Sequence, residues 1–176
     1  MKFQTTKIPG VAVIDLEPLA DERGFFARSW CAHEFAAQGL ATTIAQTSLA
    51  FTAQAGTVRG LHYQASPYAE EKLVRCVRGA AYVVVADLRP ASPTHREWIG
   101  VELSTENRRM LYIPRHCAQG YQTLVSDTEL LYQMSEFYVP ESARGVAYDD
   151  PAFGIIWPLP VSMISPKDQS WKLYAA

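Results

Sequence analysis

Short apolar runs, separated by turns, recur along almost the whole chain. The runs are rich in β-branched and aromatic side chains, whereas clusters of Pro, Gly, Asp and Ser lie between them. Short runs bounded in this way are typical of strands in a sandwich or barrel. The pattern therefore predicts strands at residues 11–16, 25–30, 44–48, 73–77, 82–88, 98–103, 110–113, 122–124 and 129–138.

Two features of this pattern predict how the strands are arranged. Residues 82–88 are apolar on both faces until Asp87, which is typical of a strand buried inside a sandwich. Arg78 and Gly79 lie between two predicted strands and are expected to form the turn of a hairpin.

Helix is a minor component of the predicted fold. Ala32, Phe35 and Ala36 follow a three-to-four spacing and Gly39 comes directly after them, which predicts one short helix over residues 31–38. Residues 149–171 are rich in turn formers and are expected to be irregular chain that packs back on the body. The expected fold class is all-β, with one or two short helices.

Length and charge limit the possible organisation and partners. A chain of 176 residues with 48% hydrophobic residues is long enough to bury one core, so we expect a single domain over residues 1–176. The formal net charge is -2 and no block of like charges occurs, which argues against a nucleic-acid-binding or anionic-membrane-binding surface.

The cysteines and the N-terminal residues indicate a cytoplasmic protein. Cys31, Cys76 and Cys117 are odd in number and have no CxxC spacing, so reduced thiols are expected instead of a disulfide framework or a zinc knuckle. The first ten residues lack a continuous apolar segment, and no later window contains 18 apolar residues. We therefore expect no signal peptide and no membrane span.

The four histidines do not form a recognisable metal-binding motif. His33, His62, His95 and His116 include no HxH, HxxxH or HExxH spacing, although a divalent ion needs several converging lone pairs. The expectation is that the protein has no metal site.

One stretch of the chain brings together chemically useful side chains. Arg59 precedes His62 by three residues, and Lys72 follows it by ten. From the residues alone, His62 is either a general base or a hydrogen-bonded core histidine. No GxSxG, P-loop or GxGxxG motif occurs, which removes the commonest esterase, phosphate-loop and dinucleotide interpretations.

Longer motifs carry a resemblance to a known family. They lie, in the family's order, at residues 21–26 (DERGFF), 59–64 (RGLHYQ), 72–76 (KLVRC), 118–121 (AQGY), 149–158 and 165–169 (SPKDQ). In these motifs the sequence resembles the dTDP-4-dehydrorhamnose 3,5-epimerase family. The resemblance implies a cupin-type β jelly roll that acts on nucleoside-diphosphate 4-keto-6-deoxy sugars without a metal or organic cofactor. It also implies a homodimer whose N-terminal strands cross to the partner.

The resemblance assigns catalytic roles to four residues. Hydrogens at C3 and C5 of such a sugar are α to the C4 ketone, so a base can remove them if the enolate is stabilised. By resemblance, His62 is the base, Asp168 pairs with its imidazole, Tyr132 is the acid on the opposite face and Lys72 stabilises the enolate. Asp87 is a rival partner for His62, because its strand position also brings it near.

Further positions match substrate-binding residues of the family. Arg23 and Arg59 match positions near the pyrophosphate and sugar, for which a guanidinium group is suited. Phe26 and Tyr138 match aromatic positions beside the nucleotide base. Gln46 is expected in the same substrate-binding set.

Three residues depart from the family pattern. Gln119 stands where the family usually has histidine, and its amide can donate a hydrogen bond but cannot titrate, which leaves open whether both C3 and C5 are inverted. Arg28 stands where many members have a glutamate that accepts from thymine, and Ser48 replaces a frequent asparagine near the same base. Because arginine only donates hydrogen bonds, a CDP-linked substrate is an alternative to a dTDP-linked one.

Three functions remain on the basis of the sequence. The first is an epimerase that inverts C3, C5 or both in a nucleoside-diphosphate 4-keto-6-deoxyhexose. The second is a monofunctional 3- or 5-epimerase, or a ketoisomerase, acting on a CDP-linked or other nucleotide sugar. The third is a cupin that binds a sugar nucleotide without turnover, although such a module has no need of an acid and a base.

Overall fold

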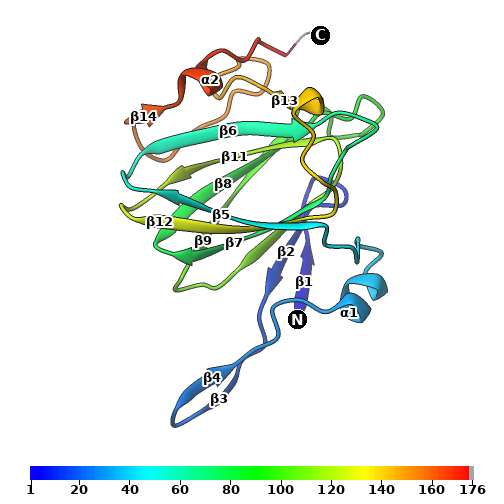
Figure 1. Ribbon diagram of the computed structural model, residues 1–176, viewed down its shortest axis with the longest axis vertical. Helices are drawn as coiled ribbons and strands as arrows, with labels where there is room; N and C mark the ends of the chain where they lie inside the picture. The colour runs from blue at the N-terminus through cyan, green and yellow to red at the C-terminus, as the bar shows by residue number, and fades with distance from the viewer. Residues whose placement is uncertain (175–176) are drawn as a thin grey trace.

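The computed structural model describes residues 1–174, and most of its strands form two large sheets (Figure 1). The first sheet has six strands, and each pairs with its neighbours antiparallel. Its order is β1 (Lys2–Thr5), β2 (Ala12–Asp15), β10 (Met110–Ile113), β7 (Lys72–Arg78), β12 (Thr128–Met134) and β5 (Gln46–Thr52).

The second sheet is built around the central strands of the chain. Its order is β13 (Ala143–Gly145), β6 (Thr57–Gln64), β11 (Cys117–Thr123), β8 (Ala80–Asp87) and β9 (Trp98–Ser104). A two-residue strand, β14 (Met163–Ile164), pairs with β6 in parallel. Consecutive strands often belong to different sheets, so the chain alternates between the two layers.

The remaining elements lie outside the two sheets. A small antiparallel ribbon of β3 (Leu19–Asp21) and β4 (Gly24–Phe26) projects away from the body (Figure 1). The helices are α1 (Ala32–Ala37), the 3-10 helix η1 (Pro140–Ser142) and α2 (Pro166–Gln169). Through residue 174, none of these helices has the length and apolar character that a membrane crossing requires.

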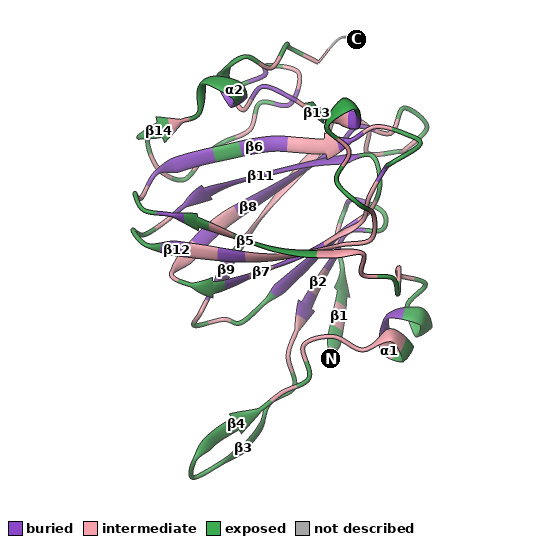
Figure 2. Cartoon of the chain, viewed as in Figure 1, coloured by how far each residue is buried: buried purple, intermediate pink, exposed green. Residues whose placement is uncertain are grey.

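The main core lies between the sheets, where buried residues concentrate (Figure 2). Alternate residues of each strand point inward, so Val74 and Leu130 of the first sheet belong to the same buried cluster as Val83 and Val85 of the second. Each such side chain contributes about 1.5–3 kcal/mol relative to an exposed position. Contacts between these apolar side chains therefore stabilise the face-to-face packing of the two sheets.

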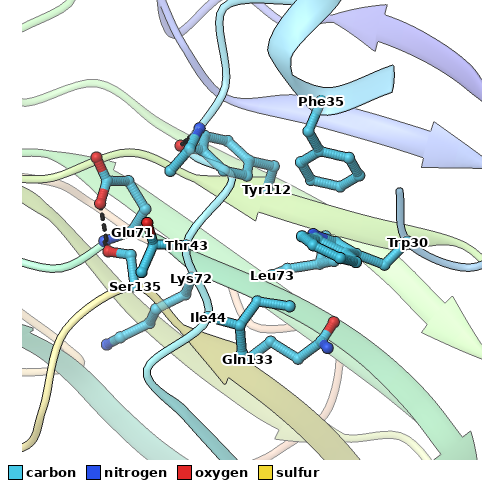
Figure 3. A pocket seen from close by; sticks show the side chains of 11 residues that line it. Trp30, Phe35, Thr43, Ile44, Glu71, Lys72, Leu73, Tyr112, Gln133 and Ser135 are labelled. Atoms are coloured by element: carbon cyan, nitrogen blue, oxygen red, sulfur yellow. Dashed lines mark hydrogen bonds between the residues drawn. The ribbon is translucent and has the colours of Figure 1, made fainter. Parts of the chain in front are cut away.

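Helix α1 covers part of the outer face of the first sheet. Phe35 is fully buried, and its ring lies 5.4 Å from that of Phe3 and 6.2 Å from that of Tyr112. A small cavity of about 20 Å³ remains beside it, with Trp30 and Leu73 on one side and the hydrogen-bonded Glu71 and Ser135 on the other (Figure 3). The apolar face of α1 thus anchors the chain between the projecting ribbon and β5.

Most of the predicted strands are confirmed, with shifted boundaries. The strands expected at residues 11–16, 44–48, 73–77, 82–88, 98–103 and 110–113 correspond to β2, β5, β7, β8, β9 and β10. The helix predicted over residues 31–38 is α1. Residues 149–171 are largely irregular, as expected, apart from β14 and α2.

The predicted hairpin at Arg78 and Gly79 is wrong. Strand β7 belongs to the first sheet and β8 to the second, so these residues form a corner between sheets. Gly79 has a φ of 75°, a conformation that favours glycine in either kind of turn. The sequence signal for a turn within a sheet and for a corner between sheets is therefore the same.

Other differences concern the extent of strands. The strand expected at 25–30 ends at Phe26, because its partner β3 has only three residues. The strand expected at 129–138 ends at Met134, and residues 122–124 overlap the end of the longer β11. Strand β6 was not predicted, since Arg59 and Gly60 interrupt its apolar pattern.

Candidate active site

A cavity of about 230 Å³ lies between the two sheets and contains most of the predicted catalytic residues. Strand β6 contributes Arg59 and His62, and β11 contributes Gln119. Strand β7 contributes Lys72, and β12 contributes Tyr132. Ala50 and Tyr121 complete the lining.

Close approach of β6 and β11 positions this group of side chains. Gly60 has a φ of 111°, and a Cβ atom there would lie 2.6 Å from the Cα atom of Gly120. Only glycine fits this contact without a backbone shift. The Gly60 N–H also donates to Oδ2 of Asp168 at 3.2 Å.

His62 and Asp168 form a tight pair although they are 106 residues apart. Nε2 of His62 lies 2.6 Å from Oδ1 of Asp168. Asp168 is held in α2, whose first turn is capped by the Ser165 hydroxyl accepting from the Asp168 N–H at 3.1 Å. The His62 side chain is 43% exposed, whereas that of Asp168 is 6% exposed, so the imidazole can reach a ligand while its partner is shielded from water.

Hydrogen bonds keep the Asp168 carboxyl ionised. Burial acts to raise its pKa, but hydrogen bonds from His62, from the Gly60 N–H and from the Trp171 indole, with the charge of His62, lower it below the ordinary value. A carboxylate in this position can orient the imidazole and stabilise its charged form.

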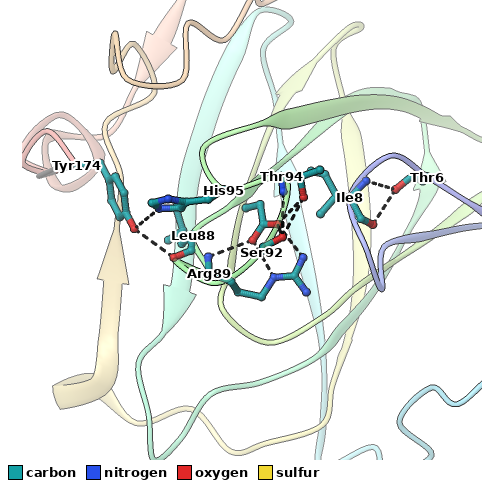
Figure 4. A network of polar contacts seen from close by, with 9 residues as sticks. Thr6, Ile8, Leu88, Arg89, Ser92, Thr94, His95 and Tyr174 are labelled. Atoms are coloured by element: carbon teal, nitrogen blue, oxygen red, sulfur yellow. Dashed lines mark hydrogen bonds and ion pairs between the residues drawn. The ribbon is translucent and has the colours of Figure 1, made fainter.

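Asp87, the alternative partner of His62, belongs to a different network (Figure 4). Its fully buried carboxylate accepts hydrogen bonds from Arg89, Ser92 and Thr94 at 2.6–2.8 Å. Burial opposes ionisation, yet these donors hold its pKa well below the usual range. Asp87 therefore orders the loop after β8 and does not contact His62.

The Tyr132 hydroxyl is a very weak acid in this cavity. Burial raises its pKa well above the ordinary value and the neighbouring Tyr121 adds to this, whereas a hydrogen bond with Gln119 and the charge of Arg59 oppose the rise. The phenol consequently keeps its proton at neutral pH. It can donate that proton only to a strongly basic species such as an enolate carbon.

Two cations also face the cavity. The ammonium of Lys72 lies 3.1 Å from a carboxylate oxygen of Glu70 and donates to the His62 carbonyl at 3.3 Å. The guanidinium of Arg59 donates to the Thr52 hydroxyl and to the Phe51 carbonyl, both at 3.0 Å. These contacts aim positive charge at a site where an anion would be stabilised.

A second cavity of about 220 Å³ shares His62 and Lys72 with the first. Gln46 and Tyr138, both predicted as substrate-binding, line it together with Arg144, Lys167 and Trp171. Gln46 accepts a hydrogen bond from the Tyr138 N–H at 2.6 Å. The predicted site thus continues into a second pocket of similar size and of mixed aromatic and cationic character.

Four predicted binding residues lie outside these two cavities. Arg23, on the turn of the ribbon, pairs with Asp21, and Phe26 at the end of β4 is 74% exposed. Arg28 pairs with Glu34 at 3.0 Å. Ser48 lies opposite Tyr132 in the β5–β12 register but is exposed.

Several residues of the site were not predicted. Glu70 and Trp171 are the clearest cases, because each contacts a predicted catalytic residue directly. Glu70 precedes Lys72 by two residues and Trp171 follows Asp168 by three, so proximity in sequence was the available signal. Within residues 1–174, no group of three or more His, Cys, Asp or Glu side chains converges to hold a metal ion.

A double-sheet β fold with a histidine–carboxylate pair facing a tyrosine across one cavity defines a class of enzyme that moves protons at carbon. Over residues 5–176 the sequence matches the model of the family described as dTDP-4-dehydrorhamnose 3,5-epimerase. The chain belongs to this family. The membership confirms the resemblance drawn from the sequence, the cupin-type β jelly roll and an enzyme of the isomerase class.

Individual relatives agree with this assignment. A dTDP-4-dehydrorhamnose 3,5-epimerase from Sinorhizobium fredii is 40% identical over 171 residues, which cover 97% of this chain and 88% of the relative. The Bacillus anthracis enzyme of the same description, solved with TDP and PPi bound, has a TM-score of 0.95 at 35% identity and covers 98% and 99% of the two chains.

A third relative was solved with a sugar nucleotide. It is the dTDP-6-deoxy-D-glucose-3,5-epimerase of Legionella pneumophila in complex with dTDP-4-keto-L-rhamnose. Its TM-score is 0.91 at 36% identity, over 98% of this chain and 92% of that one. These matches favour an epimerase over a non-catalytic binding module.

Replacing Asp168 with asparagine is expected to lower stability in a pH-dependent manner. Because the folded pKa of Asp168 is below its unfolded value of about 3.9, its stabilisation is present above that pH and is lost as pH falls through the folded pKa. Asp168→Asn should therefore reduce the free energy of unfolding by about 1–3 kcal/mol at pH 7 and by less near pH 3. Urea denaturation at several pH values measures this.

Asp149→Asn is the matched control, because Asp149 is an exposed carboxylate of the same chain. It should change stability by less than about 0.5 kcal/mol at pH 7. An Asp168→Asn effect of constant size from pH 7 to pH 3 would contradict the linkage argument.

Proposed function

We propose that the protein is a dTDP-4-dehydrorhamnose 3,5-epimerase that inverts C3 and C5 of dTDP-4-dehydro-6-deoxyglucose. The observation that carries this proposal is the position of His62 and Tyr132 on facing sheets with one cavity between them. Inversion requires a proton to leave one face of a carbon and return to the other. A base on β6 and an acid on β12 meet that requirement.

His62 removes the proton from C3 or C5, and Asp168 stabilises the resulting imidazolium. The electron pair of the broken C–H bond moves into the ring and places negative charge on the C4 oxygen. Tyr132 then donates its proton to the carbon from the opposite face, and the C4 ketone forms again. Exchange with solvent restores the proton on Tyr132 and removes it from His62.

Positive charge lowers the free energy of the enolate intermediate. Lys72 lies in the same cavity as His62 and is suited to stabilise the C4 oxygen. Gln119 lies in the same cavity as Tyr132, and its amide, which does not titrate, acts to lower the pKa of the phenol. Gln119 can therefore support both inversions although it replaces a histidine of the family pattern.

The nucleotide is proposed to be dTDP. Two similar structures contain TDP or a dTDP-linked sugar. The CDP alternative rested mainly on Arg28, whose guanidinium forms an ion pair with Glu34 in the same chain. An arginine with its own carboxylate partner gives no specific reason to prefer cytosine.

We propose a homodimer in which the β3–β4 ribbon of each subunit reaches the site of its partner. The ribbon projects from the body and exposes Leu19 and Phe26 at 73% and 74%. The outer face of the first sheet exposes Leu49 and Phe51. These exposed apolar side chains are available for burial against a partner subunit. The free thiols are consistent with the proposed cytoplasmic location.

Proton exchange in deuterium oxide tests the reaction. We expect the enzyme to introduce deuterium at both C3 and C5 of dTDP-4-dehydro-6-deoxyglucose, and much more slowly into the CDP-linked sugar, as followed by NMR. Label at one carbon would instead establish a monofunctional epimerase, and faster labelling of the CDP sugar would overturn the nucleotide assignment.

His62→Ala should lower the exchange rate by about 10²–10⁴-fold, because it removes the general base. His116→Ala is the control, since His116 is exposed and lies outside the cavity. The base assignment fails if the two variants exchange at the same rate.

Mixing of two inactive variants tests the shared site. His62→Ala removes the base, and Arg23→Ala removes a ribbon residue proposed to act in the partner's site. After dissociation and random reassembly of an equimolar mixture, about half of the dimers contain one subunit of each variant, and each of these has one intact site out of two. The mixture should therefore regain about one quarter of wild-type activity. No recovery by dimers shown to have exchanged subunits would rule out the shared site.

A further inference from the structure

The indole of Trp171 contacts both members of the His62–Asp168 pair. Its Nε1–H donates to Oδ1 of Asp168 at 3.2 Å, and this is the oxygen that lies 2.6 Å from Nε2 of His62. The rings of Trp171 and His62 meet edge to face, with centroids 6.3 Å apart. One carboxylate oxygen therefore has two ring N–H donors when the imidazole is protonated at Nε2.

The backbone provides a slot for this indole. Gly145 of β13 lies opposite His62 in the β13–β6 register. A Cβ atom at Gly145 would lie 2.2 Å from Cε2 and 2.4 Å from Nε1 of Trp171. Only a residue without a side chain leaves room for the ring at this place. The position of the hydrogen bond from Trp171 thus depends on Gly145.

The carboxylate of Asp168 has few other ways to be solvated. Its side chain is 6% exposed, and its other oxygen accepts from the Gly60 N–H. The indole is therefore one of three donors that replace water around a buried charge. The indole hydrogen bond reduces the negative charge that Oδ1 presents to His62. The carboxylate therefore stabilises the protonated imidazole less than it would without this bond.

Other charged and titratable groups also face His62. They are the cations Arg59, Lys72, Arg144 and Lys167, the carboxylate of Glu70 and the hydroxyls of Tyr63, Tyr121, Tyr132 and Tyr138. Each acts on the imidazole equally in the wild type and in a variant that changes only the indole. A comparison of the two therefore isolates the contribution of Trp171.

We propose that Trp171 is a positioning residue that adjusts the basicity of the His62–Asp168 pair through its hydrogen bond to Oδ1 of Asp168, in a slot that Gly145 leaves open. This role rests on the proposed epimerase function. Loss of the indole N–H leaves more negative charge on the carboxylate, so the protonated pair becomes more stable. The pair then reaches its basic form at a higher pH.

Trp171→Phe keeps an aromatic ring but removes the donor. We expect the acid limb of its kcat/KM profile to move to higher pH by about half a unit, a fraction of the effect of a hydrogen bond to a charged group. The position of the limb is measured separately from the height of the alkaline plateau, because Trp171 also lines the second cavity and its replacement changes that height by other routes. If Trp171 only fills space, the limb will not move, and that result overturns the proposal.

The resting enzyme provides a readout that does not depend on turnover. With ¹⁵N-labelled histidine, the titration midpoint of the His62 ring, assigned by its loss in His62→Ala, should rise by the same amount in Trp171→Phe. An inactive wild type would refute the proposed function, whereas an unchanged midpoint would refute the role of Trp171 alone.

Gly145→Ala tests the slot by a second route. The added methyl group should displace the indole and shift the pH profile in the same direction as Trp171→Phe. In a Trp171→Ala background the same substitution should have little further effect, because no ring remains to be displaced. Equal effects of Gly145→Ala in both backgrounds would contradict the slot, and thermal melts identify a variant that has failed to fold.

Discussion

The hydrogen bond between His62 and Asp168 is the constraint on which the site depends. It joins the middle of the chain to the C-terminal segment and places a buried carboxylate against an imidazole that faces the cavity. An unpaired charge in that position would be destabilising by several kcal/mol. The Gly60 N–H and the Trp171 indole therefore complete the carboxylate's hydrogen bonds, and Ser165 fixes the short helix that carries it.

The two-sheet architecture places the His62–Asp168 pair opposite the other reactive side chains of the cavity. His62 extends from the second sheet, whereas Tyr132 and Lys72 extend from the first, so a sugar ring between them would be contacted on both faces. Burial makes the tyrosine hold its proton. In the proposed reaction, the cations lower the free energy of the anion that forms when the base acts. In this scheme the configuration inverts because the base and the acid are on opposite sheets, and no movement of the protein is needed.

Some contacts of this site have a local signal in the sequence, and others have none. The grouping of Arg59, His62 and Lys72 is local and could be read directly, whereas Asp168 and Tyr132 were assigned by resemblance because contacts over long sequence separations leave no local pattern. Strand β6 was missed because Gly60, which its close approach to β11 requires, also weakens the strand signal. The corner after β7 was mistaken for a hairpin turn for a related reason, since both need glycine.

Tyr132→Phe in deuterium oxide tests whether His62 and Tyr132 act on opposite faces of one carbon. We expect this variant to exchange hydrogen for deuterium at C3 and C5 while the recovered sugar keeps its configuration, because the base remains but the opposite acid is lost. Tyr121→Phe, a change in the same cavity, should still invert. Inversion by Tyr132→Phe at the wild-type rate would contradict the account.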